Sequence, residues 1–241
     1  MNHIEPLQRL EVRRPPSCAK CTHNSHCAFS GIRNRLSDEC AAVLQRCQPV
    51  RAGTPLSRRG GPFSCVFLVC KGALKTQRVT TSGELVVSGF YLPGEVAGFE
   101  SAGEPEYCCD ILATVDSEVC RLDFDRLFMV CAGEPAMRSW MVSCIGSFVR
   151  QKDNDLTWSS AMRTEDRVLR FFTGLYQRLG GSGGRRCSLP MRKQDIASYL
   201  HMTPETLSRN LARLRKRGLL CVDDSGFEPP ATGPSPGAIQ H

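Results

Sequence analysis

The spacing of apolar residues changes along the chain, and each change predicts a different kind of structure. Between Val50 and Val130, short apolar runs alternate with glycines. Five of these runs are typical of β-strands, and they cover 64–69, 73–79, 84–91, 110–115 and 119–124. Closely spaced strands with turn signals between them predict a jelly roll or barrel. Just before this region, the pattern over 32–47, followed by Pro49, predicts a short helix.

A long helix is predicted after the strands, with Pro135 at its start, where proline is tolerated. Apolar residues at spacings of three and four share one of its faces: Met137, Trp140, Met141, Cys144, Ile145, Phe148 and Val149. The face turns polar over 152–155 and resumes at Leu156. Such a face needs a partner, and the pattern fits equally the same helix of a second chain or the chain's own β domain.

A pair of short helices joined by a tight turn is predicted near the C-terminus. It follows a helix that Thr164 can cap and Gly180 ends. The first helix of the pair covers 192–200, residues 201–202 turn the chain, and Thr203 is suited to cap the second helix. This arrangement is typical of a helix-turn-helix.

The second helix of this pair has two distinct faces. Its buried face is predicted to hold Leu207, Leu211 and Leu214, and its polar face Glu205, Ser208 and Arg209. In the major groove, arginine can bind a guanine bidentately and glutamate can accept from a cytosine amino group. The polar face therefore predicts a helix that reads base edges.

Charge along the chain supports this interpretation. The 241 residues carry a formal net charge of +7 at pH 7. Residues 161–222 hold thirteen Arg or Lys against four Asp or Glu, which gives +9 and leaves −2 for the rest. A basic module beside a slightly acidic one indicates a polyanion-binding domain joined to a second domain.

Fourteen residues are cysteine, which is unusual for a chain of this length. Cys18, Cys21 and Cys27 form a C-x2-C-x5-C pattern in a loop with almost no apolar residues to bury them. This spacing admits zinc, with His23 or His26 as a fourth ligand, or an iron–sulfur cluster with a distant fourth cysteine. The sequence starts without an apolar leader segment and contains no apolar run long enough to span a bilayer, so a cytoplasmic location is expected.

Residues 188–220 resemble the winged helix-turn-helix of the Crp/Fnr family of bacterial transcription regulators. The run Glu-Thr-Leu-Ser-Arg over 205–209 is similar to the recognition helix of its oxygen-responsive Fnr branch. The resemblance implies an α+β protein with a β-roll, a long dimerisation helix and a winged helix-turn-helix. It also implies that the chain reads a TTGAT-type half-site in double-stranded DNA through Glu205, Ser208 and Arg209, with Thr203, Thr206 and Arg213 as further predicted contacts.

The resemblance also implies a [4Fe–4S] cluster held by Cys18, Cys21, Cys27 and a cysteine of the β-roll. The segment that holds Cys120 resembles the one that supplies this fourth ligand, and Cys108 and Cys109 are the competing candidates. The remaining cysteines lie in apolar or helical patterns and are predicted to be small packing residues: Cys40, Cys47, Cys65, Cys70, Cys131, Cys144, Cys187 and Cys221.

Further partners follow from the same resemblance. We expect a homodimer, formed through Met141, Cys144, Ile145, Phe148, Lys152 and Asp155, and contacts with RNA polymerase. No membrane, no enzymatic activity and no cyclic nucleotide are expected. The last expectation rests on 101–106, where no arginine is present to bind a cyclic phosphate. The wing is expected to be short, because polar residues over 223–226 interrupt its strand.

The predicted organisation is therefore a cysteine-rich segment over 1–30, a β-roll over 31–133, a dimerisation helix over 134–160, a DNA-binding domain over 161–229 and a disordered tail over 230–241. The function predicted from sequence is an oxygen-sensing transcription regulator whose cluster promotes dimerisation and DNA binding. The alternative is a regulator of the same fold that zinc or a small molecule controls.

Overall fold

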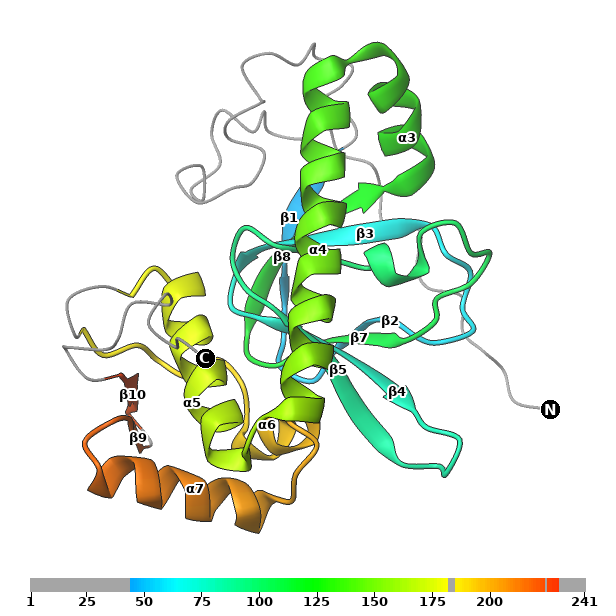
Figure 1. Ribbon diagram of the computed structural model, residues 1–241. Coiled ribbons are helices and arrows are strands. Elements are labelled where there is room, and N and C mark those ends of the chain that lie inside the picture. The colour runs from blue at the N-terminus through cyan, green and yellow to red at the C-terminus, as the bar shows by residue number, and fades with distance from the viewer. Residues whose placement is uncertain (1–43, 182–184, 224, 230–241) are drawn as a thin grey trace.

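The computed structural model describes residues 44–181, 185–223 and 225–229, without the side chains of 44–46 and 154–161 (Figure 1). The predicted cysteine-rich segment 1–30 and the predicted tail 230–241 lie outside the described residues.

Two four-stranded antiparallel sheets form the β-roll. The first has the order β1 (Leu44–Val50), β8 (Ser117–Asp123), β3 (Cys65–Lys71) and β6 (Val96–Ala97). The second has the order β2 (Pro55–Ser57), β7 (Asp110–Ala113), β4 (Leu74–Val79) and β5 (Leu85–Tyr91). The five strands predicted from the sequence are β3, β4, β5, β7 and β8, with ends shifted by one or two residues.

Both faces of the first sheet are covered, which explains why six consecutive residues of β3 are buried. Phe67 and Val69 belong to a core that also contains Leu74 and Ile111 of the second sheet. The alternate residues, such as Leu68, pack on the opposite face instead. A continuous apolar run is the pattern expected of a strand that is buried on both sides.

The outer face of the first sheet is covered by helices α3 (Phe124–Gly133) and α4 (Pro135–Ala161), which a sharp turn joins so that α3 lies beside the first turns of α4 (Figure 1). Leu127 of α3 and Met137 and Trp140 of α4 are buried against Leu122 of β8. Asp123 caps α3 by accepting a hydrogen bond from the backbone N–H of Arg126 at 3.0 Å.

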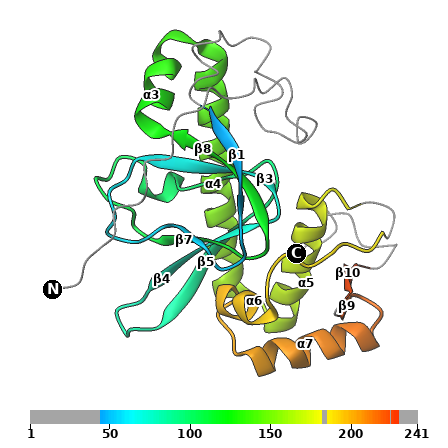
Figure 2. The same cartoon turned by 180° about the vertical axis from the view of Figure 1, so that it is seen from behind.

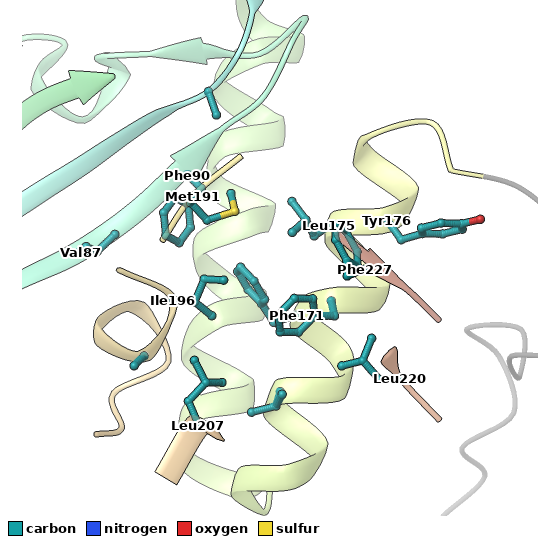
Figure 3. Packing of buried hydrophobic residues seen from close by; sticks show 14 of the residues in the cluster. Val87, Phe90, Phe171, Leu175, Tyr176, Met191, Ile196, Leu207, Leu220 and Phe227 are labelled. Carbon is teal, nitrogen blue, oxygen red and sulfur yellow. The ribbon is translucent and has the colours of Figure 1, made fainter. Parts of the chain in front are cut away.

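The C-terminal domain contains helices α5 (Thr164–Arg178), α6 (Lys193–Tyr199) and α7 (Pro204–Lys216), followed by a hairpin of β9 (Cys221–Asp223) and β10 (Gly226–Glu228). Seen from behind, α6 lies beside the β4–β5 end of the roll (Figure 2). The core of this domain extends onto β5 through Val87 and Phe90 (Figure 3).

Two sequence-based expectations were wrong. The predicted helix over 32–47 is a strand over its last four residues, because they begin β1, which pairs with β8. The rest of that prediction lies outside the described residues. Thr164 is the first residue of α5 and makes no side-chain cap hydrogen bond. The pattern also missed α3 and the shorter strands β2 and β6, which contain too few residues to show a period.

Candidate DNA-binding surface and thiol cluster

Helices α6 and α7 meet at a turn that backbone hydrogen bonds close. The N–H of Leu200 donates to the carbonyl of Ile196 over 2.9 Å, and that of Met202 to the carbonyl of Ala197 over 3.0 Å. His201 has φ of 52°, a left-handed conformation that few residues other than glycine adopt. The turn lies at the predicted position, and these hydrogen bonds fix the end of α6 from which the chain turns into α7.

Thr203 caps α7, as its sequence position predicted. Its Oγ1 accepts a hydrogen bond from the backbone N–H of Thr206 at 3.2 Å, and Arg209 donates to the Oγ1 of Thr206 over 3.3 Å. A hydrogen bond from its own backbone and one with Thr203 hold the pKa of Glu205 below its ordinary value, and the charge of Arg209 adds to this. The first turn of α7 therefore presents an ionised carboxylate next to a guanidinium group.

The two faces of α7 are divided across the helix. Glu205, Ser208, Arg209 and Arg213 are exposed, whereas Leu207 and Leu214 are buried. Leu211 is only half-buried, and Asn210, which the apolar pattern did not single out, is 3% exposed. The predicted base-reading side chains lie together on the solvent side of a helix whose opposite side is fixed by packing.

The wing is a short hairpin, in line with the interrupted pattern in the sequence. Phe227 is fully buried, and its backbone pairs with that of Cys187. Arg186 forms an ion pair with Asp223. Hydrogen bonds from Ser225 and then from Arg186 lower the pKa of Asp223 to about 2. The hairpin is thus held to the body of the domain even though each of its strands has only three residues.

The C-terminal domain is attached to the β-roll by packed rings (Figure 3). The ring of Phe90 on β5 lies 5.2 Å from that of Tyr199 and 6.0 Å from that of Phe171, centroid to centroid. These three aromatic residues come from β5, α6 and α5, so the ring packing joins the β-roll directly to two helices of the DNA-binding domain.

Ion pairs join the same two domains. Arg178 of α5 donates to the carboxylate of Glu95 at 2.6 Å, and Lys75 of β4 donates to Asp195 of α6 at 2.6 Å. Both pairs are partly shielded from solvent, with side-chain exposures of 16–32%. They add directional contacts to the ring packing and help to fix the angle between the domains.

Helix α4 has a packed side and an exposed side along its described length. Met137 and Trp140 are buried in the chain's own β domain, and Met141 and Cys144 are partly buried against the same cluster. On an adjacent side of the helix, Val142, Ile145 and Val149 are 62%, 36% and 56% exposed. Met141 and Cys144, predicted as dimer contacts, are therefore occupied at least in part within one chain, and the exposed apolar residues lie beside this packed side.

Two other predicted dimer contacts also lie against the chain itself. Lys152 donates to the backbone carbonyl of Ser88 on β5, and its ammonium group lies 5.5 Å from the centroid of the half-buried Phe148 ring. The side chain of Asp155 lies outside the described residues.

Cys120 lies on the outer face of the first sheet, where two further cysteines approach it. The sulfur atoms of Cys47, Cys70 and Cys120 all lie within 4.8 Å of one another, and those of Cys70 and Cys120 are 3.4 Å apart. Hydrogen bonds with Cys47 and Cys70, together with burial, raise the pKa of the Cys120 thiol. These three residues are called the thiol cluster below.

The sequence analysis did not identify the thiol cluster, because Cys47 and Cys70 were assigned to packing. Only the strand pairing reveals it. Cys47 stands directly opposite Cys120, and Cys70 lies on the neighbouring strand. The spacing of these cysteines in the sequence carries no signal for their proximity.

The competing candidates for the fourth cluster ligand lie in other surroundings. Cys109 is 1% exposed in the core between the sheets, and burial raises the pKa of its thiol. Cys108 is exposed, and its sulfur accepts a hydrogen bond from Ser101 at 3.4 Å. Cys120 is half-buried and belongs to neither environment. The predicted ligands Cys18, Cys21 and Cys27 lie outside the described residues.

A half-buried thiol on a sheet surface fits an iron–sulfur cluster, which needs cysteine sulfurs that can be deprotonated and reached. Cys120 is half-buried and can be reached, and binding would displace the thiol proton that its surroundings retain. The described cysteines are not joined to one another in disulfides. Cys120 also packs against the cluster that contains Trp140 of α4. The proposed ligand therefore lies close to the packed side of α4.

The loop before η3 (Phe99–Ser101) resembles a nucleotide-binding loop, but its acidic groups are engaged within the chain. Glu95 pairs with Arg178 and accepts from the N–H of Leu92 at 2.9 Å. Glu100 accepts hydrogen bonds from the hydroxyl of Tyr91 and, at 2.9 Å, from the N–H of Gly98. That no cyclic nucleotide binds remains a prediction.

Comparison with known proteins identifies the two domains. Residues 47–134 match the family model of the cyclic nucleotide-binding domain, and residues 166–227 match that of the Crp-like helix-turn-helix domain. This combination, in this order, places the chain in the Crp/Fnr family of transcription regulators, whose members are not enzymes. No described helix is long and apolar enough to cross a membrane.

Within this family the chain is similar to regulators of the Fnr type. It is 28% identical to the transcriptional activator protein FnrA of Stutzerimonas stutzeri, over 88% of each chain. It is 27% identical to the transcriptional activator protein Anr of Pseudomonas aeruginosa, over 90% of each chain. It is 26% identical to the fumarate and nitrate reduction regulatory protein of Escherichia coli, over 85% of this chain and 83% of that one.

Solved structures confirm the fold. FixK2 from Bradyrhizobium japonicum superposes with a TM-score of 0.69 at 22% identity, over 78% of this chain and 94% of that one. A CooA mutant from Carboxydothermus hydrogenoformans gives 0.68 at 16% identity, over 86% of this chain and 92% of that one. The predicted α+β architecture is therefore confirmed.

Proposed function

We propose that the chain is an oxygen-responsive transcription regulator that binds a TTGAT-type palindrome as a homodimer. The group that responds to oxygen would be a [4Fe–4S] cluster held by Cys18, Cys21, Cys27 and Cys120. When bound, it would supply the chemistry that reacts with oxygen. The observation that carries the proposal is the position of Cys120, half-buried in the packing between the first sheet and α4.

Packing contacts connect Cys120 to α4, the helix proposed to form the dimer. Cys120 and Trp140 pack in one cluster, so the placement of β8 affects how the start of α4 lies on the sheet. Further along α4, Val142, Ile145 and Val149 expose apolar side chains that a second copy of the helix would cover. Asp153, which is exposed on the same helix, opposes close pairing by like-charge repulsion, so the pair is expected to be marginal.

Dimerisation places two recognition helices on DNA. In a two-fold dimer, the α7 helices would reach half-sites one DNA turn apart, roughly 34 Å. Glu205, Ser208 and Arg209 would contact base edges, with Thr203 and Thr206 supporting them and Arg213 on the phosphate backbone. Activation of transcription then requires contacts with RNA polymerase.

The experiment is iron and sulfide analysis of chain purified without oxygen, combined with binding to a TTGAT palindrome before and after exposure to air. We expect the iron and sulfide content of one [4Fe–4S] cluster per chain and a loss of DNA affinity in air. Cys120→Ser should lose the iron and bind DNA as weakly as the air-exposed chain. Cys108→Ser and Cys109→Ser should retain the iron. Cys187→Ser, in the DNA-binding domain, is the matched control. Colourless protein that contains zinc would contradict the cluster.

A further inference from the structure

The thiol cluster brings together three sulfurs from three neighbouring strands of one sheet. Cys47 on β1 and Cys120 on β8 are direct cross-strand partners. Cys70 on β3 falls at an irregularity of the ladder, between the pairs that Val69 and Lys71 form with β8. A β-bulge redirects a side chain relative to the regular pleat. Here it accompanies a 3.4 Å approach of the Cys70 sulfur to that of Cys120.

The spacing of the three sulfurs suits a single metal ion. Ligand sulfurs that each lie about 2.3 Å from one ion are roughly 4 Å from one another. The sulfurs of Cys47, Cys70 and Cys120 lie within 4.8 Å of one another, so small rotations of the side chains would place all three around a common centre. Cys70 is 7% exposed and the other two are half-buried, so the site is shielded on one side and open on the other.

The donor set indicates which ion fits. Among the described residues, no histidine or carboxylate joins these three sulfurs within the same distance. Zinc prefers four ligands, whereas Cu⁺ accepts three and is selected by soft thiolates. The carboxylate of Glu118 accepts a weak contact from the Cys47 thiol at 3.9 Å, but it does not belong to the set.

We propose that Cys47, Cys70 and Cys120 form a three-coordinate site for Cu⁺ on the outer face of the β-roll. Binding replaces the three thiol protons, which leave to solvent, with one monovalent ion and changes no oxidation state. The site itself does not depend on the function proposed above. One consequence does rest on that proposed function. Because Cys120 would be a ligand in both sites, one chain could hold either copper at the thiol cluster or the iron–sulfur cluster, but not both.

The test uses the full chain, reduced and free of oxygen, with Cys18→Ser, Cys21→Ser and Cys27→Ser to remove the N-terminal thiols. Titration with Cu⁺ against a chromophoric Cu⁺ chelator should show one tightly bound equivalent. X-ray absorption should show three sulfur neighbours. This background carries no complete cluster site, so its result is independent of the iron content of the unmodified chain.

Matched variants decide whether the thiol cluster is the site. In that background, Cys47→Ser with Cys70→Ser should abolish the tight equivalent, whereas Cys187→Ser with Cys221→Ser should leave it unchanged. Cys47→Ala with Cys70→Ala repeats the test, and circular dichroism checks that each variant is folded. Retention of the tight equivalent by a folded Cys47/Cys70 variant would overturn the proposal. So would the absence of tight binding in the background chain, or preferential binding of Zn²⁺ over Cu⁺.

Discussion

Helices α4 and α7 both have a packed side and an exposed side, but the exposed sides differ in chemistry. In α7 the exposed side is polar, with Glu205 and Arg209. In α4 one side packs on the β-roll through Trp140, and an adjacent side exposes Val142 and Val149. A polar side is well solvated when no DNA is bound. An exposed apolar surface is typical of a protein–protein interface.

The sharpest way to break this comparison is a charge in the exposed apolar stretch of α4. Val149→Glu should leave the fold intact, because the side chain is 56% exposed, but it should prevent the helices from pairing. Loss of the second recognition helix should weaken binding to a palindrome by about 10²–10⁴-fold, as for other linked sites. Sedimentation of oxygen-free protein and DNA titration measure the two effects.

The matched control for this variant is Ser139→Glu, which adds the same charge to an exposed position near the start of α4. It should leave both dimerisation and DNA affinity close to normal. Equal effects of the two variants would contradict a dimer contact at Val149.

The packed side of α4 predicts an effect on folding instead. Trp140→Ala removes a side chain that is 7% exposed in the cluster with Leu122 and Leu127, so it should lower the free energy of unfolding by about 3–5 kcal/mol. Urea unfolding followed by circular dichroism measures the loss. Ser139→Ala, at the neighbouring exposed position, should change it by less than about 0.5 kcal/mol. If Trp140→Ala lowered the free energy of unfolding by less than about 0.5 kcal/mol, this result would contradict the packing.

On α7, the base-reading side chain should affect specificity without affecting folding. Arg209→Ala should cost about 1–3 kcal/mol in binding to the TTGAT palindrome and relax the preference at one base pair. Binding to a series of single-base variants of the site measures both. Uniform weakening across the series would instead assign Arg209 to the phosphate backbone.

Arg213 lies one turn further along α7, where the proposal assigns it to phosphate. Arg213→Ala should weaken all sequences alike and reduce the slope of log affinity against log salt by about 1. Salt titrations on the palindrome and on unrelated DNA test this. A change in base preference would contradict the assignment.

The smallest expected effect concerns the turn that joins α6 to α7. His201→Gly should raise the free energy of unfolding by less than about 1 kcal/mol, because glycine adopts φ of 52° without strain but gains more freedom when unfolded. His201→Val should lower it, since a β-branched side chain is strained in this conformation. Thermal unfolding of the three forms gives the order, and a Val variant as stable as Gly would contradict the strain.

How far the sequence predicted the structure depended on how far apart the interacting residues lie. Glu205 and Arg209 are one helical turn apart, so their shared face and the cap at Thr203 followed from local spacing. The thiol cluster did not, because Cys47 and Cys70 become neighbours of Cys120 only through strand pairing. The helical period of α4 identified one apolar face, but a period does not reveal that part of this face packs on the β-roll while Ile145 and Val149 at its edge are exposed.

The packing of Phe90 against Phe171 and Tyr199 has a consequence for the thermodynamics of DNA binding. A recognition helix on a loose tether would lose rotational freedom each time it docked, and this loss would subtract from the affinity. Because aromatic rings of the two domains pack against one another, much of the rotational freedom of the recognition helix is already lost when the chain folds. In the proposed dimer, the separation of the two half-sites would therefore be set by the protein, and DNA with altered spacing should be rejected even when both half-sites are intact.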